Sequence, residues 1–385
     1  MRLFSHKVGS LSTVLGIVLI SVLLAACGNG NAGAGNTGNG TPAASGGSST
    51  TAKAKNCTKV GVLLPETSTS PRWETYDKVY LEQDIKQISG VSIDYYNAQG
   101  DPNTQLNQAD QALTKGDCIL VVAPNDGTSA AAIVTKAQAQ GVPVIAYDRM
   151  IQAKTLNYYV SYDGVAVGNV QGQYILSHYK QYGSGKNVIM IDGSSDDPNA
   201  LQFHQGAINA LQPSYTNGTL KKLYDQFTPK WDAGTARNEF DQALTANQSK
   251  VQVAYVANDT MANSVIASLR AKKLNGKVLV TGQDATVIGL QNILKGDQAM
   301  TVYKSFSQEA QAAANIVKAL HDGTDPSSTT NFTTTKNTAG GSIPGIVLPP
   351  VAVDKTNMKK YIFDTGYLSK STVCAGIPAG TDGVC

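Results

Sequence analysis

Residues 118–163 decide the fold, and they read CILVVAPNDGTSAAAIVTKAQAQGVPVIAYDRMIQAKTLNYYVSYD. Three short apolar runs stand out in this stretch: Cys118–Pro124, Val142–Asp148 and Tyr158–Asp163. A segment with helical periodicity, Ser129–Gln140, lies between the first two runs. Strands that are apolar on both faces and separated by helices are typical of right-handed β-α-β units in a parallel sheet. The stretch therefore predicts an α/β fold.

The same alternation continues on both sides of this stretch and forms two series of about equal size. The first series adds runs at Lys59–Pro65 and Val91–Asn97, with a helix expected over Thr104–Lys115. The second series has expected strands at Asn187–Asp192, Leu220–Gln226, Val251–Asn258, Lys277–Asp284 and Met300–Lys304, and expected helices at Asn199–Leu211, Thr235–Ala246 and Met261–Ala271. Two such series predict two doubly wound parallel-sheet lobes.

The composition disfavours several classes of function. The chain has 385 residues, enough for two domains, with 31 Lys and Arg against 28 Asp and Glu. It has no basic cluster, so it lacks the electrostatic footprint of a nucleic-acid-binding protein. Its four histidines are too few and too scattered for a histidine metal cage. The motifs of phosphate-binding loops, zinc proteases and serine hydrolases are also missing, and we expect no catalytic residue, metal or cofactor.

The N-terminal segment predicts export. An uncharged run that begins at Val8 ends in Leu24-Ala-Ala-Cys27, which resembles the lipobox of bacterial lipoproteins. The resemblance implies a signal peptide over residues 1–26 and a lipid on Cys27; a plain transmembrane anchor is the alternative, because the run just reaches spanning length. Residues 27–58 are mostly small and polar and are expected to form a flexible tether. Either alternative places the rest of the chain outside the cytoplasm.

Four further cysteines, Cys57, Cys118, Cys374 and Cys385, are expected to form disulfides, because an even number in an exported chain usually does. Cys57 and Cys118 each precede an apolar run, and these runs are expected to be neighbouring parallel strands. Cys374 and Cys385 would close a short C-terminal loop. We favour the pairs 57–118 and 374–385 over the other two connectivities.

Polar side chains follow almost every expected strand, where a doubly wound sheet binds its ligand. These residues are Glu66, Arg72, Trp73, Asn97, Asn125, Asp126, Tyr147, Asp148, Arg149, Tyr162, Asp163, Asp192, Asp197, Asn199, Asn258, Asp259, Gln283, Asp284, Tyr303 and Lys304. Paired carboxylates, amides and cations suit a ligand that carries many hydroxyl groups, such as a sugar.

Each of these residues also has a structural alternative. Trp73 and Trp231, the only tryptophans, either stack on a sugar ring or are ordinary core or surface aromatics. The Asp and Asn residues either contact the ligand or cap the helices that follow, and we interpret Asp126 and Asp163 as caps. A guanidinium has no capping role at this position, so Arg149 favours the interpretation as a binding site.

Several longer strings resemble those of a known family. They are Ala146-Tyr-Asp-Arg-Met-Ile151, Tyr158-Tyr-Val-Ser-Tyr-Asp163, Ala243-Leu-Thr-Ala-Asn247, Gly282-Gln-Asp-Ala285 and Met300-Thr-Val-Tyr-Lys304. They resemble the periplasmic xylose-binding proteins, which belong to the ribose-binding-protein-like group of sugar receptors. The resemblance extends from about Lys59 to Leu368.

The resemblance implies a type I periplasmic binding protein fold whose two hinged lobes close on one monosaccharide. It implies a first lobe over 59–162 and 304–340, a second over 163–303 and 341–370, and a tail over 371–385. Hinge strands are expected near Tyr162, Lys304 and Gly345–Val351. The expected partners are a monosaccharide, an ABC permease with a cytoplasmic ATPase, and the membrane through the lipid on Cys27, for a monomeric receptor that contacts no nucleic acid.

By matching position, the resemblance also implies the ligand-binding residues Arg72, Trp73, Asp148, Arg149, Asp197, Asn199, Trp231, Asn258, Asp284 and Lys304. D-xylose is the expected ligand. However, Pro65–Trp73 and Lys230–Asp232 look more like receptors for several aldoses, including glucose, galactose and arabinose. Pro198 stands where the family often has Asn, so a contact from that side chain is lost.

Three other functions remain as alternatives. A repressor of the same fold would carry an N-terminal helix-turn-helix, but a signal segment and tether take that place here. A receptor used for chemotactic sensing has the same sequence features as a transport receptor. A surface glycosidase needs a pair of carboxylates, and nothing in the sequence singles out two of them.

Overall fold

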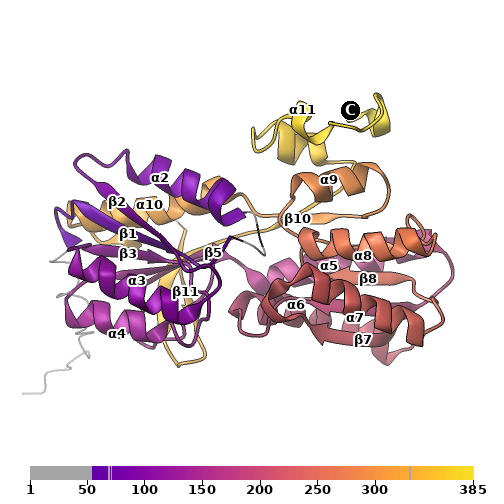
Figure 1. Cartoon of the computed structure of the whole chain (residues 1–385), viewed down its shortest axis with the longest axis horizontal. Coiled ribbons are helices and arrows are strands. Elements are labelled where there is room, and N and C mark those ends of the chain that lie inside the picture. The colour runs from indigo at the N-terminus through magenta and orange to yellow at the C-terminus, as the bar shows by residue number, and fades with distance from the viewer. Residues whose placement is uncertain (1–53, 68–69, 71, 329–330) are drawn as a thin grey trace, which may run out of the picture. The chain divides into compact units, whose positions relative to one another are not determined.

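The computed structural model describes residues 54–67, 70, 72–328 and 331–385 (Figure 1). The predicted signal peptide, Cys27 and most of the predicted tether lie outside these residues. No helix within the described ranges is long and apolar enough to cross a bilayer.

The first sheet has seven strands in the order β11-β12-β5-β4-β3-β1-β2, and all of its pairings are parallel except that of β11 with β12. Its strands are β1 (Lys59–Leu64), β2 (Ser92–Asn97), β3 (Ile119–Val122), β4 (Val144–Tyr147), β5 (Tyr158–Tyr162), β11 (Phe332–Lys336) and β12 (Ser342–Leu348). The five expected strands of the first series are therefore confirmed, and β1 lies between β2 and β3 as in other doubly wound sheets.

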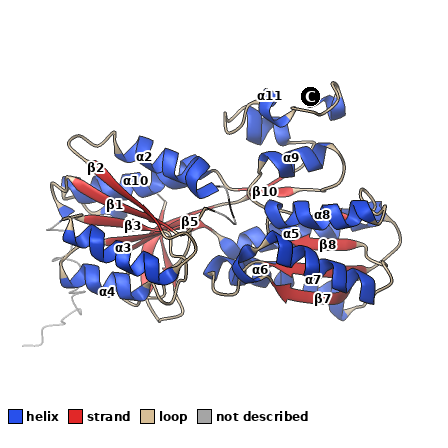
Figure 2. Ribbon diagram, viewed as in Figure 1, coloured by secondary structure: helices blue, strands red, loops and turns tan. Residues whose placement is uncertain are grey.

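Helices cover both faces of this sheet. They are η1 (Trp73–Asp77), α2 (Lys78–Ile85), α3 (Pro102–Thr114), α4 (Ala131–Ala139), α10 (Phe306–Asp322) and the short turn η4 (Pro326–Ser328). Helices α2 and α10 pack on one face, and α3 and α4 pack on the other (Figure 2). Each face thus has its own apolar core, which explains why the strands are apolar on both sides.

The second sheet has the order β7-β6-β8-β9, and all of its pairings are parallel. Its strands are β6 (Asn187–Asp192), β7 (Lys221–Phe227), β8 (Val253–Val256) and β9 (Leu279–Val280). Its helical elements are α5 (Gly164–His178), η2 (Tyr179–Tyr182), α6 (Pro198–Thr216), η3 (Pro229–Trp231), α7 (Ala233–Ala246), α8 (Asp259–Ala271) and α9 (Val287–Leu294). Four expected strands of the second series lie in this sheet.

The fifth expected strand of that series is not a member of the sheet. It forms β10 (Thr301–Tyr303), which pairs antiparallel with β13 (Val351–Val353). An isolated parallel bridge between Gln283 and Val302 and a hydrogen bond from the Ala285 backbone N–H to the Thr301 hydroxyl join it to the preceding chain. Both strands of the pair are three residues long and stand next to points where the chain passes between the lobes.

The expected boundary at residue 341 requires a correction, because β12 lies in the first sheet and pairs with β5. The chain enters the second lobe only after Leu348, at β13. Gly345 permits this pairing, since a Cβ atom there would lie 1.8 Å from the carbonyl oxygen of Tyr159. The first lobe is therefore made of the chain up to β5 together with the segment from α10 to β12.

The chain thus crosses between the lobes three times: after β5, after β10 and after β12. Hydrogen bonds join these crossings to one another. The Tyr162 hydroxyl accepts a bond from the backbone N–H of Ser305 (2.7 Å) and donates one to its carbonyl oxygen (3.1 Å). The backbone N–H of Asp163 donates to the carbonyl oxygen of Leu348 at 3.0 Å.

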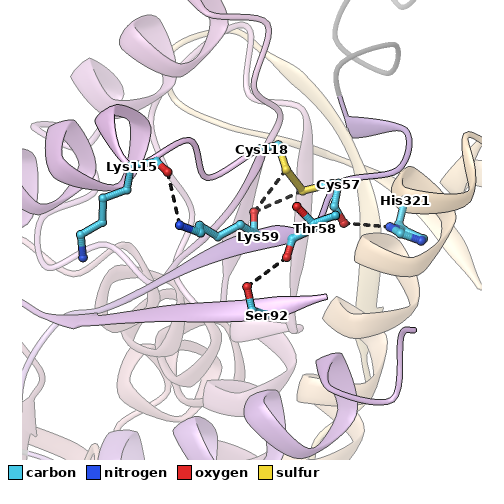
Figure 3. Close-up of a disulfide and its surroundings, with 7 residues drawn as sticks. All are labelled: Cys57, Thr58, Lys59, Ser92, Lys115, Cys118 and His321. Atoms are coloured by element: carbon cyan, nitrogen blue, oxygen red, sulfur yellow. Dashed lines mark hydrogen bonds between the residues drawn. A yellow bond between two sulfur atoms is a disulfide. The ribbon is translucent and has the colours of Figure 1, made fainter. Parts of the chain in front are cut away.

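The described cysteines form the two favoured pairs, Cys57–Cys118 and Cys374–Cys385, each with 5.6 Å between Cα atoms. The first pair joins the starts of β1 and β3, and the Cys57 carbonyl oxygen lies 2.8 Å from His321 Nδ1 on α10 (Figure 3). The second pair closes a loop in the tail over 371–385, where α11 (Lys370–Val373) ends and η6 (Thr381–Gly383) lies; η5 (Lys359–Phe363) precedes the tail. Apolar tail residues share a core with helix α9.

Asp117, next to the first disulfide, is a buried carboxyl group whose titration should make the stability of the protein depend on pH. It is 1% exposed, and neither carboxyl oxygen has a hydrogen-bond partner among the described residues. Burial, followed by the nearby charge of Asp94, raises the pKa of Asp117 to about 7. The folded state therefore keeps a proton that the unfolded state has lost above about pH 4, so stability falls as the pH rises from 4 through 7.

We expect Asp117→Asn to remove this slope and to make the protein more stable than the wild type at pH 8. Urea unfolding at pH 5 and pH 8 measures the effect, and Asp110→Asn, whose side chain is 47% exposed and paired with Lys136, serves as the control. Equal pH dependence in wild type and Asp117→Asn would contradict the assignment.

Candidate functional site

One cavity in the structure contains the whole predicted site. It is lined by Glu66, Ser70, Arg72, Trp73, Asp148, Arg149, Asp197, Asn199, Phe203, Trp231, Asn258, Gln283, Asp284 and Lys304. All ten residues predicted from the sequence are in this set, and they come from both lobes. The structure thus brings the ten residues together, while their contact with a ligand stays a prediction.

Arg72 organises the part of the cavity that belongs to the first lobe. Its Nε and Nη2 atoms donate to the two carboxyl oxygens of Asp77 at 2.8 and 2.7 Å. Its Nη1 donates to Asp148 at 2.7 Å, and its Nη2 also donates to Glu309 at 3.0 Å. The guanidinium carbon lies 4.5 Å from the ring centre of Trp73. Four hydrogen bonds to three buried carboxyl groups, together with one ring, therefore hold a single cation in place.

Asp148 follows β4 and is the most strongly held carboxylate of the cavity. Burial alone would raise its pKa, but the charges of Arg72, Lys304 and Arg149 outweigh burial and lower it to about 2. Its other carboxyl oxygen accepts a bond from Asn199 Nδ2 at 3.0 Å. Asp148 is therefore ionised at neutral pH, and it links the two lobes through Asn199.

Arg149 makes a second contact between the lobes. Its Nε lies 2.8 Å from Asp197 Oδ2, and both side chains are less than a tenth exposed. The same Asp197 oxygen accepts from Trp231 Nε1 at 3.1 Å, and the Arg149 guanidinium lies 5.1 Å from the Trp73 ring centre. Both tryptophans are thus walls of the cavity, next to its charges.

Lys304 lies where the chain crosses from β10 to α10. Its Nζ is 3.5 Å from Asp284 and 3.8 Å from Asp148, so it links carboxylates of both lobes. The ammonium also lies 5.5 Å from the ring centre of Phe203. Because Lys304 is only 3% exposed, these interactions take place largely away from water.

Nε1 of Trp73, a donor, and Oε1 of Gln283, an acceptor, are buried polar atoms of the cavity that make no hydrogen bond among the described residues. Both residues line the cavity and are at most 3% exposed. Buried polar groups normally have partners, so these two atoms are candidates to bond a ligand.

Several Asp and Asn residues cap helices, which the sequence analysis gave as the alternative to contact with a ligand. Asp163 accepts from the backbone N–H of Ala166 at the start of α5, so its cap interpretation is confirmed. Asp126 accepts from the backbone N–H of Ser129 in the turn before α4, whose N-cap is Ala130, so Asp126 caps a turn and not the helix. Asp197 caps α6 and Asn258 caps α8, yet both also line the cavity. Capping and facing the cavity are therefore compatible in one side chain.

The ten expected ligand-binding residues did not include Ser70, Glu66, Gln283 or Phe203, which also line the cavity. Glu66 and Gln283 were named among the polar strand ends, so the sequence did carry a signal for them. Phe203 carried none, because it lies in the apolar pattern of α6. Its ring lies 6.4 Å from that of Trp231.

The cavity itself is small, about 30 Å³. That volume holds about two water molecules. A wider cavity of about 380 Å³ adjoins it and shares Arg149, Asp197 and Trp231. The ion pairs across the small cavity take up most of the space between the two sets of side chains.

The chain is similar to a known protein family and to several of its members. A model of the periplasmic binding protein domain matches residues 60–325. The D-xylose-binding periplasmic protein of Escherichia coli is 31% identical over 313 residues, which cover 81% of this chain and 92% of that protein. A multiple sugar-binding periplasmic receptor of Rhizobium radiobacter is 33% identical, with 80% of this chain and 90% of that protein covered. Among solved structures, a similar one is a carbohydrate transporter solute-binding protein of Chloroflexus aurantiacus in complex with D-glucose. It is 31% identical to this chain, with a TM-score of 0.74, and the match covers 81% of this chain and 97% of that one.

Proposed function

Because the chain belongs to the periplasmic binding protein family, with the sugar receptors of ABC transporters as its relatives, we propose that its cavity binds one monosaccharide, D-xylose, for delivery to an ABC permease. The observation that carries the proposal is that all ten expected ligand-binding residues line one cavity between two sheets. The protein binds and releases the sugar without changing it.

The charges of the cavity explain how a sugar would bind. Asp148, Asp197 and Asp284 offer carboxylate oxygens, while Arg149 and Lys304 offer donors, so neighbouring hydroxyl groups can be bonded in pairs. The rings of Trp73 and Trp231 can cover the C–H faces of the sugar. A sugar enters only if the contacts Arg149–Asp197 and Asp148–Asn199 separate, because the cavity is too small while they persist.

Binding is therefore an exchange in which the hydroxyl groups of the sugar replace contacts between the lobes. The lobes open by rotation at the three crossings, and the wider neighbouring cavity gives the sugar its route. Contacts to both lobes at once then favour the closed form, which is the differential interaction that a ligand-driven closure needs.

A receptor for several aldoses, serving transport or chemotactic sensing, is the second candidate. The receptor from R. radiobacter named for multiple sugar binding is as similar as the xylose-binding one, and the structure from C. aurantiacus holds D-glucose. Isothermal titration calorimetry of the full chain with xylose, glucose, galactose, arabinose and ribose separates the two. One-to-one binding of xylose alone supports the first candidate, several comparable affinities support the second, and no binding overturns both.

The two tryptophans provide an independent test. Because they are the only ones in the chain and both line the cavity, sugar binding should change the intrinsic fluorescence. We expect Trp231→Phe to weaken binding about fivefold, since it loses the bond to Asp197, worth about 1 kcal/mol. In Trp231→Phe, Trp73 is the only tryptophan left, so any fluorescence change on sugar binding comes from it. A variant with Phe at both positions should show no change in tryptophan fluorescence. A Trp231→Phe titration with no fluorescence change would contradict the placement of Trp73.

Lipid attachment at Cys27 completes the proposal and keeps a monomeric receptor at the outer face of the membrane. It rests on the Leu24-Ala-Ala-Cys27 string alone. In cells supplied with labelled palmitate, the wild type should carry label and partition with membranes, whereas Cys27→Ser should do neither. Label on the Cys27→Ser variant would overturn the assignment.

A further inference from the structure

Away from the sugar cavity, the described residues contain a cluster of side chains that can bind metal. Asp192 at the end of β6, His204 on α6 and Asp225 on β7 each place one ligand atom within 4.8 Å of the other two. None of the three lines the cavity. The parallel pairing of β6 with β7 and the contact of α6 with β7 bring these three residues together, although they lie apart in the sequence.

Asp192 is the residue that needs an explanation. It is 1% exposed, and neither of its carboxyl oxygens has a hydrogen-bond partner among the described residues. Asp225 brings a second carboxyl group to it, because one oxygen of each lies within 4.8 Å of the other. Two carboxyl groups this close, one of them buried, require a proton or a cation between them.

The third residue supplies the nitrogen that such a cation prefers. His204 Nε2 lies 3.1 and 3.2 Å from the two carboxyl oxygens of Asp225, a separation that ligands of one ion also have. The side chains of His204 and Asp225 are 25% and 20% exposed, so an ion from solvent can reach them. Lys222 pairs with Asp225, but its side chain is 35% exposed and its ammonium can turn into solvent.

We propose that Asp192, His204 and Asp225 form a binding site for one divalent transition-metal ion, Zn²⁺ by preference, with water as the fourth ligand. An imidazole nitrogen and carboxylate oxygens are donor types that Zn²⁺ accepts, and a site with three protein ligands keeps a fourth position for water. The ion ties together β6, β7 and α6. It also sits at the base of the loop after Asp192, which leads to Asp197 and Asn199 in the cavity. The site itself does not depend on the proposed sugar.

The test is calorimetric titration of Zn²⁺ into the full chain, purified without a histidine tag and dialysed against chelator. We expect one saturable site and a higher thermal unfolding midpoint with Zn²⁺. His204→Gln should lose both effects. His178→Gln is the matched control, because this histidine lies on α5 and its ring contacts only Tyr174 among the described residues; it should behave as the wild type.

Asp192→Asn distinguishes an ion from a shared proton. If a metal ion is bound, this variant loses the Zn²⁺-induced shift of the unfolding midpoint. If a proton alone joins the carboxyl groups, the wild type shows no saturable Zn²⁺ binding, and the proposal is overturned. Wild-type affinity in His204→Gln would overturn it as well. Co²⁺ gives a further readout, since its visible absorption should appear in the wild type and in His178→Gln but not in His204→Gln.

Discussion

Replacing Arg72 with methionine is expected to be the most destabilising single change in the site, at about 3–5 kcal/mol, the usual cost of removing one partner from a buried ion network. Arg72 donates hydrogen bonds to Asp77, Asp148 and Glu309, and these carboxyl groups are all at most 3% exposed. Methionine fills similar space but leaves these groups without their shared cation. The free-energy cost is largest at Glu309, because its other carboxyl oxygen has no hydrogen-bond partner among the described residues. Urea unfolding followed by circular dichroism measures the loss.

Lys318→Met on helix α10 is the matched control for this experiment. Lys318 forms an ion pair with Asp322, and its side chain is 60% exposed, so no measurable loss is expected. A second comparison uses Arg72→Met combined with Glu309→Gln, which removes one of the unpaired carboxyl groups and should restore part of the stability. If Arg72→Met and Lys318→Met unfold at the same urea concentration, the Arg72 network does not stabilise the fold.

Replacing Arg149 with alanine is expected to weaken sugar binding by about 10- to 100-fold while the protein remains folded, because a hydrogen bond from a charged group is worth about 1.5–3 kcal/mol. Arg149 pairs with Asp197 across the lobes and faces the ring of Trp73. Asp197 keeps its bonds from the Asn199 backbone and from Trp231, so the loop around it retains its donors. Calorimetry with the best sugar of the panel measures the change.

Arg237→Ala provides the control in this case. Arg237 forms an ion pair with Asp241 on helix α7, and its side chain is 49% exposed and outside the cavity. This variant should bind sugar with wild-type affinity. Arg149→Lys should fall between the two, because lysine keeps the charge but not the planar group that bonds in two directions. Unchanged affinity in Arg149→Ala would remove Arg149 from the binding site.

The sequence predicted the strands and their polar ends well because parallel sheets impose a simple rule. Every strand buried on both faces must be apolar, and the carboxyl ends of one parallel sheet meet at one edge, so the residues after Val122 and Tyr147 were bound to lie near one another. Arg149 stood out because a guanidinium at such a position has no capping role, whereas Lys304 was selected by the resemblance of Met300–Lys304. The same logic identified the cysteines that join β1 and β3.

The sequence could not reveal contacts that depend on packing between distant segments. Glu309 lies on an amphipathic helix, where a glutamate normally faces solvent, yet it is fully buried against Arg72, 237 residues away in the chain. The place of β12 was equally hidden, because Pro344 and Gly345 weaken its strand pattern, and only the close approach to Tyr159 explains the glycine. Asp192 and His204 belong to the same class of hidden contact.

The position of β12 has a consequence for the order in which the protein is made. β5 lies between β4 and β12, so one edge of β5 has no partner until residues 342–348 have been synthesised and exported. An unpaired edge of a buried strand is a template for association with other chains. During secretion the first lobe therefore stays open to such association until nine-tenths of the chain has emerged, which makes this protein dependent on rapid completion, or on a chaperone that covers β5.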